Sequence, residues 1–282
     1  MGEQKHAVAQ RPAKQDRFIR WLIGILCAIL VVAGIVMGWE ASEQKEMGHV
    51  QVTYSKTPTL FVSGDYSNWL TFGPMNARFE RYDIGQAVWT IHVAKDGNPT
   101  IDKRGSLGKR NPLILVLFAD NHHASREAKQ LTNVMRILKQ REHIKTVNMV
   151  GHSSGNNIIY QYLTGRAADQ REDYPKTAKF VNIATTFSKK ERAAADRFPH
   201  HIQVLNIAGD MFGTGGDLGV SVKGDHQLGE MLAGRVDGYQ SETIVGGISV
   251  LHYLLHQNPH VDRAITDFLW QARYTPQTNY PH

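Results

Sequence analysis

Cysteine is nearly absent from this sequence. The 282 residues include one, Cys27, and it lies within an apolar run near the N-terminus. A single thiol excludes internal disulfides, so the folded part must be stabilised by packing. Internal repeats and low-complexity tracts are also missing, so one domain over about residues 56–273 is the simplest division of the chain. The adjacent His122 and His123 have no third ligand at metal spacing, so we expect no metal and no cofactor.

The excess of positive charge is small, +6 over the whole chain. Half of it lies before Trp21, where five basic residues oppose two acidic ones, and the rest of the chain holds 27 Lys or Arg against 24 Asp or Glu. No cluster of basic and aromatic residues resembles a nucleic-acid module, so we expect no nucleic-acid partner.

Charge is wholly absent from Trp21 to Trp39. Nineteen such residues approach the ~20 needed to cross a bilayer and exceed the ~7–15 of a signal-peptide core. Basic residues precede the run and acidic residues follow it at Glu40, Glu43 and Glu46, which predicts a cytoplasmic N-terminus. We therefore expect a cytoplasmic basic tail (1–20), a single-pass signal anchor in the cell membrane (21–39) and an extracellular body. Cleavage near residues 36–38, giving a secreted protein, is the alternative.

Apolar strand-like runs alternate with helical stretches in the body. After a linker (40–55), the predicted strands are residues 59–62, 87–94, 113–118, 146–150, 180–184, 204–208 and 240–245, and the predicted helices include 125–140, 156–164 and 261–270. This alternation is typical of an α/β fold with a mostly parallel sheet flanked by helices. One domain (56–273) and a short C-terminal tail (274–282) complete the organisation.

The pattern G-x-S-x-G occurs at residues 151–155, between a predicted strand and a predicted helix. Gly151 and Gly155 lack the Cβ atoms that would collide at such a tight turn, which exposes the Ser153 hydroxyl to a base. The N-terminus of the following helix directs backbone N–H groups toward a developing oxyanion. Ser153 is therefore the expected nucleophile.

An acid and a base follow the serine in the order that such a turn requires. The loop after strand 204–208 holds Asp210 and Asp217, and we favour Asp217 as the acid because Leu-Gly-Val follows it; Asp210 is the alternative and would otherwise bond loop amides. Asp225 is expected to be a solvated loop residue. His252, after the next strand, is the expected base. His256 is the reserve candidate and is otherwise expected to pack near the site.

The oxyanion hole needs two backbone donors, one after the nucleophile and one after the first strand. Ser154 and Asp65 occupy those positions. Residues 66–72 either wall an acyl pocket or pack the first helix of the body. The segment 185–201 is short and charged, which favours an open cleft over a large apolar lid.

Several separated motifs resemble one family in order: Pro58 to Gly64, the 150–155 turn, residues 207–210 with Gly216-Asp217, and His252 with 256–259 and 267–270. Together they are similar to a cell-surface α/β-hydrolase family of Gram-positive bacteria, related to lipase-like serine esterases. The resemblance implies the α/β-hydrolase fold, a Ser153, Asp217, His252 triad and cleavage of an ester or similar acyl bond. Relatives commonly have His-Gly at 63–64 and Gly at 156, where this chain has Ser63 and Asn156.

The sequence thus favours a membrane-anchored, outward-facing serine hydrolase that cleaves carboxylic esters through an acyl-enzyme. Its expected partners are a small-molecule or lipid-like acyl substrate and the membrane. Two alternatives stay open: a peptidase or amidase with the same triad, and a non-catalytic surface binding protein on a degenerate hydrolase fold. Oligomeric state leaves no signal in the sequence.

Overall fold

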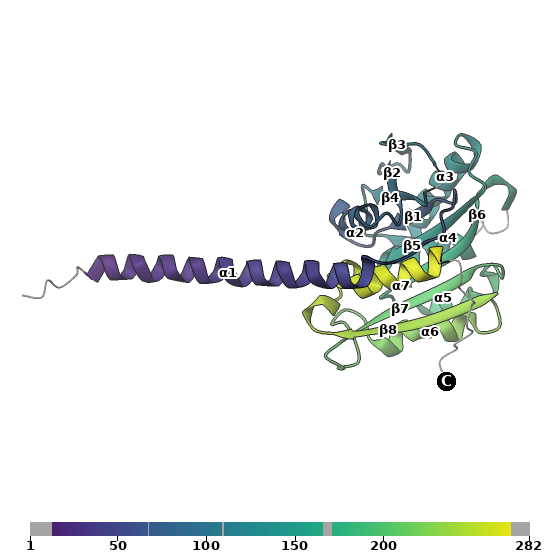
Figure 1. The fold of residues 1–282 in the computed structure, drawn as a ribbon. Helices are drawn as coiled ribbons and strands as arrows, with labels where there is room; N and C mark the ends of the chain where they lie inside the picture. The colour runs from purple at the N-terminus through teal and green to yellow at the C-terminus, as the bar shows by residue number, and fades with distance from the viewer. Residues whose placement is uncertain (1–12, 67, 109, 166–170, 272–282) are drawn as a thin grey trace, which may run out of the picture. The chain divides into compact units, whose positions relative to one another are not determined.

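The computed structural model describes residues 13–66, 68–108, 110–165 and 171–271 (Figure 1). The expected C-terminal tail and most of the expected cytoplasmic tail lie outside these ranges. The chain divides into two compact units, residues 1–48 and 49–282. In the first, α1 (Ala13–Met47) is a continuous helix that contains the uncharged run, and its Arg17–Met47 portion is long and apolar enough to cross a membrane.

The second unit is built on an eight-stranded sheet of order β3-β2-β4-β1-β5-β6-β7-β8. The strands are β1 (Thr59–Val62), β2 (Gln86–Val93), β3 (Pro99–Lys103), β4 (Pro112–Phe118), β5 (Thr146–His152), β6 (Lys176–Ile183), β7 (Gln203–Met211) and β8 (Gly238–Gly246). Every neighbouring pair is parallel except β2 with β3. The predicted, mostly parallel sheet is confirmed. Only β3 was not predicted, because it is a short, largely exposed edge strand without an apolar run.

Helices cover both faces of the sheet, as Figure 1 shows for α7 in front and α6 behind. The α-helices of this unit are α2 (Trp69–Arg81), α3 (Ala124–Gln140), α4 (Ser154–Thr164), α5 (Lys189–Ala193), α6 (Val222–Leu232) and α7 (Pro259–Trp270). Short 3₁₀ turns lie at Arg171–Asp173 (η2), Ala195–Arg197 (η3), Ile248–Val250 (η4) and Leu255–Gln257 (η5). The predicted helices correspond to α3, α4 and α7.

Successive side chains of β1 point to opposite faces of the sheet, so this strand contributes to the core on both faces. Leu60 and Val62 belong to the buried cluster that includes residues of α3, α4 and α6. Phe61 points the other way, and its ring lies 5.3 Å from that of Phe72 in α2. On the same side, Phe79 of α2 meets Trp270 of α7 edge-on at 5.5 Å. A strand buried on both faces is continuously apolar, which explains why β1 was predicted with its observed bounds.

Loops that follow the strands meet at the carboxyl edge of the sheet. Because β1, β5, β7 and β8 are parallel neighbours or near neighbours, their carboxyl ends lie along one edge. Loops at this edge of an open parallel sheet form ligand sites. Ser153, Asp217 and His252 all belong to such loops.

Candidate active site

Ser153 lies on a sharp turn between β5 and α4. Its backbone has φ 54° and ψ −134°, a strained conformation for a residue other than glycine. A Cβ on Gly155 would lie 2.2 Å from the Val62 carbonyl oxygen, and one on Gly151 would lie 2.3 Å from Asn156 Oδ1. The predicted need for both glycines is confirmed, and their absence of side chains lets β1 pack directly against the turn.

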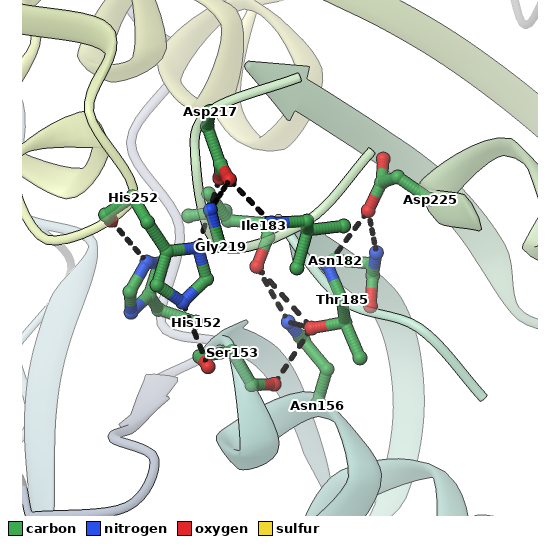
Figure 2. A network of polar contacts seen from close by, with 11 residues as sticks. His152, Ser153, Asn156, Asn182, Ile183, Thr185, Asp217, Gly219, Asp225 and His252 are labelled. Carbon is green, nitrogen blue, oxygen red and sulfur yellow. Dashed lines mark hydrogen bonds and ion pairs between the residues drawn. The ribbon is translucent and has the colours of Figure 1, made fainter. Parts of the chain in front are cut away.

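The structure brings Ser153, His252 and Asp217 into one chain of hydrogen bonds (Figure 2). His252 Nε2 lies 3.0 Å from Ser153 Oγ, and His252 Nδ1 lies 2.8 Å from Asp217 Oδ2. In this geometry an imidazole can take the proton of the hydroxyl while the carboxylate orients the ring. The three residues come from the loops after β5, β7 and β8.

Asp217 is completely buried and tightly held. Its Oδ1 accepts hydrogen bonds from the amides of Gly219 at 2.8 Å and Val220 at 2.5 Å, and its carbonyl accepts the His252 amide at 2.9 Å. A Cβ on Gly219 would lie 2.5 Å from His252 Cγ, so only glycine lets the ring approach. The alternative acid, Asp210, instead accepts the Gly215 amide at 2.8 Å and stabilises its own loop.

Asp65 and Ser154 are neighbours, as the expected oxyanion hole requires. The Asp65 amide donates to Ser154 Oγ at 2.6 Å, so this donor is engaged within the protein. Gly64 permits the contact, because a Cβ there would lie 2.7 Å from Ser154 Oγ. A hydroxyl that accepts one hydrogen bond still has its own proton to donate.

The two positions that differ from the resembled family have distinct environments. Asn156 is fully buried behind the turn and donates to the Ile183 carbonyl at 2.9 Å and to Thr185 Oγ1 at 2.6 Å. It therefore ties α4 to the carboxyl end of β6. Ser63 is also buried, and its hydroxyl has no hydrogen-bond partner among the described residues.

Two further histidines lie beside the triad, His152 against His252 and His256 against His152. His152 Nε2 lies 2.9 Å from the His252 carbonyl oxygen, and the ring of His256 meets that of His152 edge-on at 4.6 Å. Burial, followed by the charges of Arg78 and His252, lowers the pKa of His256 to about 4. Burial also holds the pKa of His152 well below 6.5. Both rings are therefore neutral near pH 7, and the neutral His152 donates its Nε2 proton to the carbonyl. The prediction that His256 packs near the site is confirmed.

The expectation that Asp225 is a solvated loop residue is wrong. Asp225 lies in the first turn of α6 and is completely buried, with its carboxylate accepting the Thr185 amide at 2.7 Å and Asn206 Nδ2 at 2.9 Å. Burial raises the pKa of this carboxyl well above 3.8. Thr185 in turn donates its hydroxyl to the Ser153 carbonyl at 2.6 Å, so the network reaches the nucleophile turn (Figure 2).

A sequence signal for this network existed. Asn182 and Asn206 lie within apolar strands and are register partners on β6 and β7. A buried amide in a strand needs a polar partner, and here the partner is Asp225. If α6 had been predicted, Asp225 in its first turn would have been the expected partner of the two buried asparagines.

The model of a family described as alpha/beta hydrolase of unknown function (DUF915) matches residues 48–196 and 191–272. The chain belongs to this hydrolase family. The hydrolase is similar in fold to the product of the gene lin2722 from Listeria innocua, with 20% identity, a TM-score of 0.69, and coverage of 79% of this chain and 96% of that one.

Two other solved structures resemble this hydrolase. A protein of Lactobacillus plantarum WCFS1, provisionally named a cell surface hydrolase, is 18% identical with a TM-score of 0.66, covering 78% of this chain and 92% of that one. A carboxyl esterase from Bacillus coagulans is 11% identical with a TM-score of 0.50, covering 78% and 91%. These likenesses show the fold. No curated protein matches the sequence.

A cavity of about 390 Å³ opens beside Ser153 in this hydrolase. Its polar lining residues include His152, His256 and Gln257, and its apolar lining residues include Leu70 and Leu254. Of the segment 66–72, expected either to wall a pocket or to pack a helix, Tyr66, Leu70 and Thr71 line the cavity, whereas Phe72 is core; Ser67 lies outside the described residues. Among the described residues, no group of three or more His, Cys, Asp or Glu is placed to hold a metal ion.

Proposed function

We propose that this hydrolase is a membrane-anchored serine esterase, with Ser153 as nucleophile, His252 as general base and acid, and Asp217 as the carboxylate that orients the ring. The observation that carries the proposal is the continuous hydrogen-bond chain, 3.0 Å from Ser153 Oγ to His252 Nε2 and 2.8 Å from His252 Nδ1 to Asp217 Oδ2. A non-catalytic binding protein would have no need to keep these three groups aligned at a strained turn.

The reaction follows from the positions of the protons. His252 Nε2 takes the Ser153 hydroxyl proton as Oγ attacks the ester carbonyl, and it then gives that proton to the departing alkoxide. Water repeats the sequence on the acyl-enzyme, losing a proton to His252 and releasing the acid as Ser153 recovers its own. Asp217 stabilises the imidazolium at each stage, and its two amide donors hold the carboxylate in position.

The oxyanion is stabilised by donors at Ser154. Its backbone N–H begins α4, where the helix dipole adds a partial positive charge. Its hydroxyl accepts the Asp65 amide at 2.6 Å and donates its own proton toward the oxyanion, so the Asp65 N–H acts through Ser154 Oγ. This arrangement replaces the direct Asp65 donor that the sequence suggested.

The anchor is α1, whose uncharged run from Trp21 to Trp39 is preceded by basic residues and followed by acidic ones. This charge distribution supports a cytoplasmic N-terminus and an extracellular hydrolase unit. The neutral rings and apolar walls of the cavity suit an acyl chain better than a charged peptide.

The test is covalent labelling of the full-length protein in detergent micelles with a fluorophosphonate, with the adduct located by mass spectrometry. We expect labelling at Ser153, hydrolysis of short p-nitrophenyl esters, and loss of both in Ser153→Ala. Matched p-nitroanilides should be cleaved far more slowly. Ester hydrolysis that persists in pure Ser153→Ala protein would refute the mechanism, and faster anilide cleavage would favour an amidase.

A further inference from the structure

Exposed apolar side chains gather around the opening of the active site. After the carboxyl end of β1, Tyr66, Trp69 and Leu70 are 82%, 46% and 63% exposed. After that of β7, Phe212 and Leu218 are 67% and 75% exposed. Large apolar side chains exposed singly are ordinary on protein surfaces, but a contiguous group marks an interaction site.

The end of β8 and the turns that follow it add Val245, Ile248, Tyr253 and Leu254, all of them exposed. We call these four side chains and the five after β1 and β7 the apolar rim. In the described part of residues 49–282, Tyr54 is the one other large apolar side chain that is exposed, so nine of these ten side chains belong to the rim. Their confinement to one edge of the sheet indicates a specific use.

Three rim residues expose their side chains from strained backbone. Tyr66, Phe212 and Leu218 have φ of 55°, 55° and 69°, a region that bulky residues rarely adopt. Such conformations are strained, and they cluster at functional sites. Packing alone does not explain them, because these side chains are mostly in solvent.

Charge is sparse in the same loops, and Lys and Arg are absent from them. The loop after β1, residues 63–68, contains one charged residue, the exposed Asp65. Residues 246–258 contain no Asp, Glu, Lys or Arg, and residues 211–221 contain one, the buried Asp217. A protein partner or an anionic surface recognised through charge would require charged residues here. A neutral apolar phase requires none.

The rim is continuous with the active site. Tyr66, Leu70, Tyr253 and Leu254 line the cavity beside Ser153, and Phe212, Leu218 and Ile248 lie on the loops that carry Asp217 and His252. Val245 lies at the end of β8, and Trp69 begins α2 at the outer side of the rim, where it lines a separate hollow. A substrate that lies in an apolar phase against the rim therefore has a direct path to the nucleophile.

The chain also supplies a reason for that phase to be a bilayer. Residues 48–58 join α1 to β1, but Thr53 and Ser55 are already hydrogen-bonded to Trp270 and Asn111. Only residues 48–52, which reach roughly 18 Å when extended, therefore separate α1 from the body of the hydrolase unit. A membrane spanned by α1 is therefore present near the hydrolase unit at a high effective concentration, whereas a second copy of the chain is not held there.

We propose that the apolar rim docks on the zwitterionic or neutral lipid surface of the membrane that holds α1, and that the substrates are ester lipids drawn from it into the cavity. The substrate half of this proposal rests on the proposed esterase function. The docking half does not, so the two can be tested apart.

Docking is tested with full-length Cys27→Ser protein in phosphatidylcholine vesicles, labelled with a polarity-sensitive fluorophore at Ile248→Cys. The matched control is Lys145→Cys, an exposed residue just before β5 at the opposite edge of the sheet. We expect a blue-shifted emission at position 248, quenched by nitroxide-bearing lipids and insensitive to salt, and no such change at position 145. Water-like, unquenched emission at position 248 would overturn the docking.

Substrate access is tested with the double variant Phe212→Asn, Ile248→Gln, since Asn tolerates the positive φ at position 212. We expect at least a tenfold slower release of fatty acid from phosphatidylcholine in the same vesicles, with unchanged hydrolysis of a soluble butyrate ester. Tyr54→Gln, outside the rim, should change neither rate. Equal lipid hydrolysis by wild type and double variant would refute delivery through the rim. Absence of soluble-ester hydrolysis in the wild type would refute the esterase function instead.

Discussion

Acidification should destabilise this hydrolase through a histidine that remains neutral in the folded state. His256 is 7% exposed, and its pKa is lowered to about 4, whereas the unfolded chain has an ordinary value near 6.5. A histidine with a depressed folded-state pKa contributes stability above the unfolded value, and that stability is lost as pH falls through the folded value. The affected window therefore runs from about pH 6.5 down to about pH 4.

The magnitude follows from the two pKa values. Between pH 7.5 and pH 5.0 the unfolded histidine takes up its proton and the folded one does not, which lowers the free energy of unfolding by about 2 kcal/mol. Because pH 5.0 already lies above the folded-state pKa, a folded-state pKa even lower than about 4 would give nearly the same loss of stability over this interval. The buried His152 titrates in the same direction and adds to the slope.

The assay compares urea unfolding of full-length wild type and His256→Asn in detergent micelles at pH 7.5 and 5.0, followed by tryptophan fluorescence. Asn retains an acceptor for the Gln257 amide, which now donates to His256 Nδ1 at 2.8 Å. The variant should lose about 2 kcal/mol less than wild type over this interval. His92→Asn, at an exposed site, should behave as wild type. An unchanged pH slope in His256→Asn would show that His256 is not held neutral.

Four other substitutions probe the active site and the buried polar network behind it. Asp217→Asn should lower kcat roughly 10⁴-fold by removing the group that orients His252, while Asp210→Asn should leave kcat near wild type; equal losses would refute the choice of acid. Ser154→Ala should lower kcat about 10²-fold with little change in KM, since one oxyanion donor is lost. A faster Ser154→Ala enzyme would mean instead that the hydroxyl blocks the Asp65 amide. Asp225→Asn should gain stability relative to wild type as pH rises, because burial raises the pKa of Asp225 and its ionisation costs stability in wild type alone; urea unfolding at pH 5 and 8 measures this, and parallel curves would contradict it.

The sequence alone determined the features that depend on local pattern. The apolar runs at β1, β4, β5 and β7 predicted a parallel sheet because a strand covered on both faces has no polar alternation. The glycines at 151 and 155 predicted the turn at Ser153, since only residues without Cβ fit where β1 and α4 meet β5. The positions of Ser153, Asp217 and His252 along the chain could be predicted because each residue follows a strand whose carboxyl end lies at the same edge of the sheet.

Only the tertiary structure decided how side chains distant in sequence meet. The burial of Asp225 depends on α6 packing over β6 and β7, and the engagement of the Asp65 amide depends on a 2.6 Å approach to Ser154 Oγ. The apolar rim likewise consists of residues from three loops, none of which is unusual by itself. Local propensity specifies elements and turns, but burial, pKa and surface continuity depend on contacts between elements, and those exist only once the sheet has assembled.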